Sequence, residues 1–306
     1  MNQYNLTNMI NMTNMTNMTN MINYTTNKDV IIFAPEFNEK LDIELISNFT
    51  KLIFSDYVLN DKFNNKLFET YINNGNFNNY VRANSKFNKE VFNLPQGITH
   101  LIFGCDFNKP VNDLPSSIIY LIFGKYFNLE INNLPKSLKY LKFDFYSHFY
   151  RSVDNLPHSI IHLTLGYYFN LEVNNLPQNL INLTFEYYFN RKVNNLPNKI
   201  MYLTFGENFN QTLDYLPNSV KVLRLGSKFN MELNNLPMSL FAVIFCKNSK
   251  FDIEFNSLPN SIEFIQLPEK YDKRISHIPF KLKQIVCSED YDYLDDFAKY
   301  DVKHYS

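Results

Sequence analysis

The amino-acid sequence predicts a mainly β repeat solenoid, in which short parallel strands form one curved sheet and the convex side is irregular or built from 3₁₀ turns. Three observations predict this fold class. A Phe-Asn pair recurs about every 20 residues, proline recurs at a second position of the period, and glycine recurs at a third. Because chance does not align three residue types in one phase, the period is structural.

The repeat can be written FN-x3-[VIL]-x-x-LP-x-S-[LI]-x-x-L-x-F-G-x-x, as in the segment from Phe107 to Tyr126. Most of the 13 prolines and of the 7 glycines keep this phase. The prolines in phase are Pro95, Pro115, Pro135, Pro157, Pro177, Pro197, Pro217, Pro237, Pro259 and Pro279, and the glycines are Gly104, Gly124, Gly166, Gly206 and Gly226. Two-residue insertions precede Phe149 and Phe251 without breaking the pattern.

Each repeat contains one short strand. Leu138, Leu141 and Phe143 illustrate the Leu-x-x-Leu-x-Phe spacing that is typical of leucine-rich repeats. Period-two alternation places Leu141 and Phe143 on one face of the strand and Tyr140 and Lys142 on the other. A strand this short in every repeat pairs with its neighbours in parallel, at a spacing of about 4.8 Å.

The Leu-Pro element is predicted to lie on the return path, since proline has no N–H for a ladder. We expect polyproline-like or 3₁₀ turns there, because about 20 residues leave little room for a helix. The Phe of each Phe-Asn pair should pack inward, and its Asn should bond neighbouring backbone in a ladder that includes Asn170, Asn190, Asn210 and Asn230. With only 7 glycines, asparagine is also expected at turn positions that need a positive φ.

The chain divides into four segments. Residues 1–28 are a low-complexity Asn/Met/Thr tract that we expect to be disordered. Residues 29–86 are predicted to be degenerate N-terminal repeats that act as a cap, with further Phe-Asn pairs at Phe63 and Phe77. Residues 87–290 contain about ten repeats, and residues 291–306 form a C-terminal cap or tail.

The Phe-Asn pairs, the Leu-Pro pairs and the Leu-x-Phe-Gly strands resemble the FNIP-repeat family. The resemblance covers roughly residues 87–290, with weaker traces back to about residue 37. It implies a leucine-rich-repeat-like solenoid that binds proteins, and the Asn-rich composition resembles members of giant-virus (Mimivirus) or social-amoeba type. Several giant-virus relatives carry an N-terminal F-box, but Pro35 argues against an opening helix here, so residues 29–60 are interpreted as a decayed repeat.

Composition and motifs argue against several function classes. A formal net charge of −1 lacks the basic footprint of a nucleic-acid binder, and no apolar run is long enough to span a bilayer. The sequence has no phosphate loop, no dinucleotide fingerprint and no Gly-x-Ser-x-Gly motif. His100 and His162 share the outward phase but are three repeats apart, about 14 Å, which is too far for a shared metal or a proton relay. We therefore expect no enzymatic activity, no catalytic residues, no cofactor and no metal.

The cysteines indicate a compartment. Cys105, Cys246 and Cys287 are too far apart in the repeat array to form disulfides, so they are predicted to be reduced thiols of a cytoplasmic protein, in the host cytoplasm if the protein is viral.

The outward positions of the strands carry the predicted binding site, because tyrosine and basic residues there alternate with apolar ones and tyrosine is a frequent interface anchor. The predicted partner-binding residues on the concave face are His100, Tyr120, Ile122, Tyr140, Lys142, His162, Tyr202 and Arg224. A second row, Tyr126, Tyr168 and Tyr188, precedes the Phe-Asn pairs and is predicted to stack between adjacent repeats.

The sequence therefore predicts a non-enzymatic, monomeric repeat scaffold that binds a protein, expected to be a host protein, through its concave strands, with no nucleic acid or membrane as partner. One alternative is a substrate receptor of a ubiquitin ligase, which would need helices within residues 29–86. Another is a structural or decoy repeat protein without a specific partner.

Overall fold

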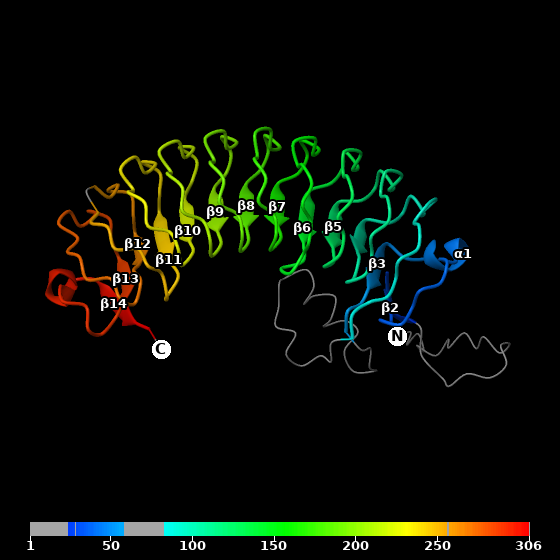
Figure 1. Cartoon of the computed structure of the whole chain (residues 1–306), viewed down its shortest axis with the longest axis horizontal. Coiled ribbons are helices and arrows are strands. Elements are labelled where there is room, and N and C mark those ends of the chain that lie inside the picture. Colours follow the sequence, from blue (N-terminus) through cyan, green and yellow to red (C-terminus); the bar gives the residue numbers. More distant parts are fainter. Residues whose placement is uncertain (1–23, 28, 58–82, 256, 306) are drawn as a thin grey trace, which may run out of the picture.

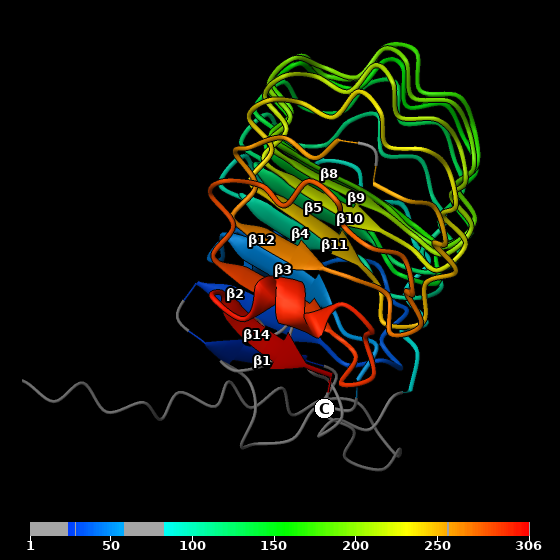
Figure 2. The same cartoon turned by 90° about the vertical axis from the view of Figure 1, so that its left-hand side faces the viewer.

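The computed structural model describes residues 24–27, 29–57, 83–255 and 257–305. These residues form a curved arch of stacked turns with one 14-stranded sheet and almost no helix (Figure 1). Viewed from one end, the successive turns overlay one another and their strands lie side by side (Figure 2). The fold is thus the parallel β-solenoid that the repeat predicts.

Every strand of the sheet has three or four residues. The strands are β1 (Tyr24–Asn27), β2 (Val30–Phe33), β3 (Lys51–Phe54), β4 (His100–Ile102), β5 (Tyr120–Phe123), β6 (Tyr140–Phe143), β7 (His162–Leu165), β8 (Asn182–Phe185), β9 (Tyr202–Phe205), β10 (Val222–Leu225), β11 (Ala242–Phe245), β12 (Phe264–Gln266), β13 (Gln284–Cys287) and β14 (Asp301–His304). The described helices are α1 (Ile43–Ile46) and the 3₁₀ helix η1 (Leu294–Phe297).

Sequence order is also the order of strands in the sheet. Strands β2 to β14 pair in parallel, and equivalent repeat positions face each other, as Leu163 faces Leu183 and Leu183 faces Leu203. Among the strand pairs of the described residues, only β1–β2 is antiparallel. Residues at the same position of successive repeats therefore form one row that crosses the strands of the sheet.

Two columns of mostly aromatic side chains run through the core, which also contains many Leu, Ile and Val side chains. Among the described residues, the Phe that opens each repeat is buried and lies against the next one, as Phe189 does against Phe209 and Phe209 does against Phe229, with ring centroids 6.1 Å apart in both cases. Within a repeat the strand Phe lies against the same column, and the Phe185 and Phe189 ring centroids are 3.7 Å apart. The inward packing predicted for these phenylalanines is confirmed.

Side chains link successive repeats on the return path. The Oδ1 atoms of Asn170, Asn190 and Asn210 accept the backbone N–H of the Asn one repeat later at 2.9 Å, which confirms the predicted ladder. The Leu-Pro elements form single turns, in which the residue three after proline donates its N–H to the proline carbonyl, as from Leu180 to Pro177 at 3.1 Å. In the described part of the chain these turns do not extend into helices within the repeats.

The expectation that asparagine supplies many positive-φ turns is wrong. Among the described non-glycine residues only Asn84 and Asn93 have a positive φ. The other described asparagines have a negative φ, and several of them, such as Asn170 and Asn190, bridge successive repeats through their side chains.

The N-terminal segment joins the same sheet. Tyr24–Asn27, which we expected to be disordered with the rest of residues 1–28, forms β1 on β2. Strands β2 and β3 pair in parallel, and Asn38 Oδ1 accepts the Asn88 N–H at 3.0 Å, so the ladder passes directly from Phe37-Asn38 to Phe87-Asn88. Residues 1–23 and the Phe-Asn pairs at Phe63 and Phe77 lie outside the described residues.

The C-terminal end of the core is covered by η1 and β14. Phe297 of η1 is buried, and its ring lies 6.3 Å from that of Tyr291, which continues the core column. Asp296 pairs with Arg274, whose Nε lies 2.8 Å from Asp296 Oδ2. These contacts make residues 291–305 an ordered part of the solenoid.

Candidate functional site

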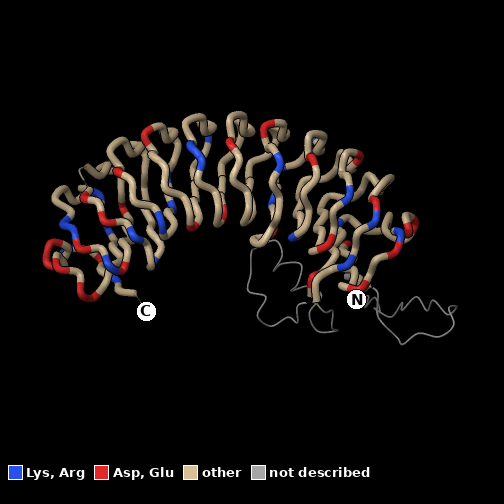
Figure 3. Tube along the Cα trace, viewed as in Figure 1, with Lys and Arg blue, Asp and Glu red and all other residues tan. Residues whose placement is uncertain are grey.

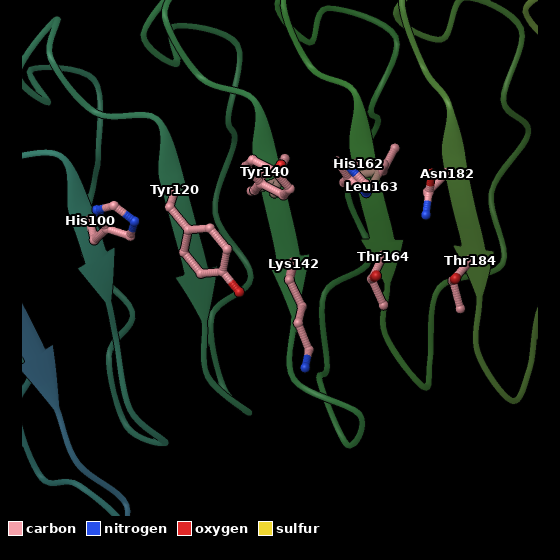
Figure 4. A pocket seen from close by; sticks show the side chains of 10 residues that line it. His100, Tyr120, Tyr140, Lys142, His162, Leu163, Thr164, Asn182 and Thr184 are labelled. Carbon is pink, nitrogen blue, oxygen red and sulfur yellow. The ribbon is translucent and has the colours of Figure 1, made fainter. Parts of the chain in front are cut away.

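Outward side chains of the strands form regular rows on the concave side of the arch. Pairing in register aligns Tyr140 with His162, His162 with Asn182 and Asn182 with Tyr202. Two residues further along each strand, a second row contains Lys142, Thr164, Thr184, Thr204 and Arg224. Figure 4 shows part of both rows as two levels that cross the strands.

Four aromatic rings stack across strands β4 to β7. The ring centroids are 5.4 Å apart for His100 and Tyr120, 5.5 Å for Tyr120 and Tyr140, and 4.4 Å for Tyr140 and His162. Thr99 Oγ1 lies 2.9 Å from His100 Nδ1. Parallel strand spacing places one ring in each repeat, so the stack follows directly from the repeat.

A groove of about 580 Å³ runs along this stack. Besides the four rings, its lining includes Lys142, Thr164, Asn182 and Thr184. Aromatic faces, hydroxyl groups, an amide and an ammonium group thus meet in one concavity, which can offer both apolar contact and hydrogen bonds to a bound segment.

The predicted binding residues are divided among three environments. His100, Tyr120, Tyr140, Lys142 and His162 line the groove, although Tyr120 is only 8% exposed. Tyr202 is 45% exposed and Arg224 is also exposed, further along the same rows.

Ile122 offers little surface to a partner, contrary to what its outward phase predicts. It is buried in a second apolar cluster on the concave side, with Val30, Ile32, Ile53 and Ile102, against which Tyr57 packs. Apolar outward positions on neighbouring strands cover one another, and this could not be deduced from one repeat alone.

Burial changes the ionisation of several groups at the groove. It lowers the pKa of His100 to about 4, with the positive charge of Lys51 contributing and Asp29 opposing. It also lowers the pKa of the Lys142 ammonium, against the opposing effect of Asp144 and Glu186. His162 has a lowered pKa for the same reason, desolvation. Neutral imidazoles fit a stack against tyrosine rings.

Two carboxylates near Lys142 occupy positions where other repeats have glycine. Asp144 and Glu186 follow β6 and β8. Burial raises the pKa of Glu186 to about 6, Lys142 opposes this shift and Asp144 adds to it. The sequence marks both carboxylates only by the fact that they replace glycine at its position in the repeat.

Sequence reasoning also left out residues that border the groove. Asn182, Thr164 and Thr184 line the groove from outward strand positions, but neither charge nor aromatic character distinguishes them in the sequence. Lys139 and Lys221 are exposed and immediately precede β6 and β10. In each repeat two successive N–H groups donate to one carbonyl, as Lys139 and Tyr140 do to Ile119, so strict alternation does not hold at the strand start.

The second tyrosine row stacks between repeats as expected. His148 bridges Tyr126 and Tyr168 with edge contacts, at ring-centroid distances of 5.1 and 4.8 Å, and the Tyr168 and Tyr188 centroids are 5.4 Å apart. Beside them Tyr167 and Tyr187 stack at 4.5 Å. Because these rings occupy each other's faces, they are assigned to the packing of adjacent loops.

The three cysteines are free thiols, with Cys105 and Cys287 buried. Burial raises the pKa of the Cys287 thiol to about 11, which disfavours the reactive thiolate. Among the described residues, no group of three His, Cys, Asp or Glu side chains is placed to hold a metal ion. Within those same ranges, no helix has the length and apolar character required to cross a membrane.

Charged residues of both signs are distributed along the arch, and the middle repeats carry fewer of them than the two ends (Figure 3). The net charge of −1 is therefore not the sum of two segregated patches. Local charge pairs on the concave strands, rather than a global field, distinguish one part of this face from another.

Comparison with known proteins gives a family match and two solved folds. The sequence matches the family described as FNIP Repeat over residues 110–146 and, in overlapping segments, 152–188, 170–208, 189–228 and 209–247. No curated protein matches the chain.

Among solved structures, the chain is similar to CroV588 of the giant virus CroV, which is described as a novel circular LRR protein, with 25% identity and a TM-score of 0.45. The alignment covers 88% of this chain and 51% of CroV588, so the chain spans about half the length of that protein. YopM from Yersinia enterocolitica aligns with 16% identity and a TM-score of 0.35, over 83% of this chain and 67% of YopM.

Proposed function

We propose that this chain, which contains FNIP repeats over residues 110–146 and 152–247, is a non-enzymatic scaffold that binds a protein partner through its concave strand face. The groove lined by the stacked rings of His100, Tyr120, Tyr140 and His162 is the observation that carries this proposal. Repeat solenoids present extended concave surfaces of this kind to their partners. Tyrosine supplies large contact area at a small cost in side-chain entropy.

The family resemblance supports a further part of the proposal. We place the partner among the proteins of an amoebal host and the site of action in the host cytoplasm, as for a giant-virus member of the family. The free, largely buried thiols are compatible with a reducing compartment.

The test is a quantitative pull-down from amoeba lysate with the full chain as bait. Tyr140 and Tyr202 are 37% and 45% exposed, so the variant Tyr140→Glu/Tyr202→Glu should fold, whereas Tyr120 is too buried for a charge. The matched control is Tyr215→Glu, because Tyr215 is 67% exposed and precedes a Leu-Pro element on the return path.

A partner recovered stoichiometrically by the wild type and the control, but lost by the concave variant, is the expected result, provided that all three proteins have the same melting temperature. A partner retained by the concave variant and lost by Tyr215→Glu would move the interface to the convex side. Recovery of no stoichiometric partner by any of the three proteins would contradict the proposal.

A further inference from the structure

Two pairs of basic residues lie at strands β6 and β10, four strands apart, with Lys142 and Arg224 in the outward row of the concave face. Lys139 and Lys142 belong to the repeat of β6, and Lys221 and Arg224 belong to the repeat of β10. Lys139, Lys221 and Arg224 are exposed, and within the described ranges their side chains form no salt bridge. We refer to these two pairs as the β6 pair and the β10 pair.

Uncharged polar side chains connect the two pairs. Thr164, Thr184 and Thr204 lie between Lys142 and Arg224 in one row that the strand pairing keeps in register. Each hydroxyl can donate and accept one hydrogen bond, which suits the alternating N–H and C=O groups of an extended backbone. Tyr140 and Tyr202 stand beside the two ends of this row and offer apolar area.

The distance between the pairs defines the length of a ligand. Four strand spacings of about 4.8 Å separate β6 from β10, which gives roughly 19 Å. An extended chain advances roughly 3.3 Å per residue, so two side chains that reach the two pairs are roughly six residues apart in the ligand.

The positive charge of the β6 pair and of the β10 pair favours a negatively charged ligand at both places, but the net charge differs between the two pairs. Asp144 and Glu186 reduce the positive charge near the β6 pair, as their interaction with Lys142 indicates. At the β10 pair the positions that correspond to Asp144 and Glu186 are Gly226 and Pro268, so neither position supplies a carboxylate next to Lys221 and Arg224. The β10 pair is therefore the stronger anchor, and it includes Arg, a residue enriched at interface hot spots.

We propose that the concave face between β6 and β10 binds an extended acidic segment of a partner protein, with two carboxylate side chains about six residues apart on the two basic pairs. This inference rests on the proposed function and adds to it the chemistry and the spacing of the partner. It assigns roles to Lys139, Lys221 and the threonine row, which the sequence did not single out.

The test selects peptides from a phage-displayed random dodecapeptide library on the immobilised full chain. The enriched sequences should carry two Asp or Glu residues about six positions apart. A synthetic, fluorescein-labelled peptide with the enriched sequence then serves as the probe in fluorescence anisotropy.

The variant Lys221→Glu/Arg224→Glu should weaken this peptide at least about tenfold, and Lys142→Gln should weaken it less, because the charge there is already partly compensated. The matched control is Lys136→Glu/Lys192→Glu, which makes the same charge change at two exposed residues of the return path and should leave binding unchanged. In a second peptide, Lys replaces the acidic residue that faces the β10 pair. This peptide should bind the Lys221→Glu/Arg224→Glu variant better than it binds the wild type. Unfolding of the variant cannot produce tighter binding.

Four results overturn the inference. If the enriched peptides lack acidic pairs but lose binding to Tyr140→Glu/Tyr202→Glu, the concave face still binds proteins and only the acidic class is wrong. If the peptides bind all concave variants equally, both this inference and the concave site of the proposed function fail. The inference also fails if no peptide is enriched. It fails as well if a labelled oligodeoxythymidine binds more tightly than the selected peptide. The pull-down tests the proposed function separately.

Discussion

Single glycines control how closely the loops after the strands approach one another. A Cβ built on Gly124 would lie 2.0 Å from the carbonyl oxygen of Gly104, and one on Gly226 would lie 2.0 Å from that of Gly206. None of the described glycines has a positive φ, so their role is close approach rather than unusual backbone geometry. This explains the in-phase glycines of the repeat.

We predict that Gly124→Ala destabilises the protein by about 1–3 kcal/mol, because backbone rather than a movable side chain blocks the new methyl group. Gly97→Ala is the matched control, since a Cβ there meets nothing within 4 Å and the change should be neutral or slightly stabilising. Urea denaturation of both variants measures the difference. Equal stability of the two would show that the loops separate freely.

Ionisation of the His100 imidazole makes the stability of the folded protein depend on pH. Burial and Lys51 lower its pKa from 6.5 to about 4 in the folded protein. Between these values the unfolded chain binds more protons than the native one, so protons favour unfolding and stability rises with pH. The stabilising effect is complete above about pH 6.5 and is lost as the pH falls towards 4.

We therefore predict that the free energy of unfolding decreases between pH 6.5 and 4 and that His100→Gln makes this dependence shallower. Part of the slope should remain, because His162 also has a lowered pKa. Guanidinium denaturation at a series of pH values measures the slope, and NMR follows the His100 ring directly. A His100 midpoint near 6.5 would contradict the prediction.

The repeated elements are held together by side chains that reach from one repeat to the next. Besides the asparagine ladder, the Ser of the Leu-Pro-x-Ser element donates to a carbonyl of the preceding repeat, as Ser159 does to Leu138 at 2.7 Å. Both residue types recur in many of the repeats because each satisfies a backbone group on the return path, outside the sheet ladder.

We predict that Asn190→Ala costs about 1 kcal/mol or less, because it removes the acceptor of the Asn210 N–H at an exposed site. Asn190→Asp keeps an acceptor oxygen and should restore most of the stability. Asn198→Ala is the control, since the structure gives Asn198 no side-chain hydrogen bond within the described ranges. Thermal unfolding compares the three variants, and a larger loss for Asn198→Ala would refute the role of the ladder.

At the scale of the whole molecule, the solenoid is a quasi-one-dimensional array. Each inner strand contacts its two neighbours in the sheet, and an aromatic column runs from Phe37 to Tyr291, stacked as far as Tyr271 and tilted at its last pair. Stability in such arrays comes from the interfaces between repeats rather than from each repeat alone.

We predict that deletion of residues 170–189 leaves a folded solenoid with one repeat fewer, because Phe169 then precedes Asn190 and the Phe-Asn phase is preserved. Deletion of residues 170–179 removes half a period and should prevent cooperative folding, since it places polar residues at core positions. Circular dichroism and thermal melts distinguish the two. Similar loss of structure in both variants would show that the repeats are not interchangeable.

Much of the fold could be predicted from the sequence, because a short period imposes one geometry many times. The strands, the inward phenylalanines and the asparagine ladder all follow from residues that recur in phase. For the groove, the sequence identified Tyr140, Lys142 and His162 by outward phase. Strand β1 could not be predicted in this way, because it contains no residues that recur in the repeat phase. It pairs with β2 in antiparallel orientation, outside the clear repeats.

The sequence by itself determined the solenoid, the face that each strand residue occupies and the order of side chains across the sheet, because strand pairing in register converts the repeat phase into spatial rows. Only the tertiary structure decided which outward residues remain accessible. Ile122 is covered by neighbouring strands while Tyr202 is not, and the proposal that the two basic pairs bind one ligand depends on the spacing of β6 and β10 in the sheet. Accessibility and spacing depend on packing between repeats, and no single repeat contains that information.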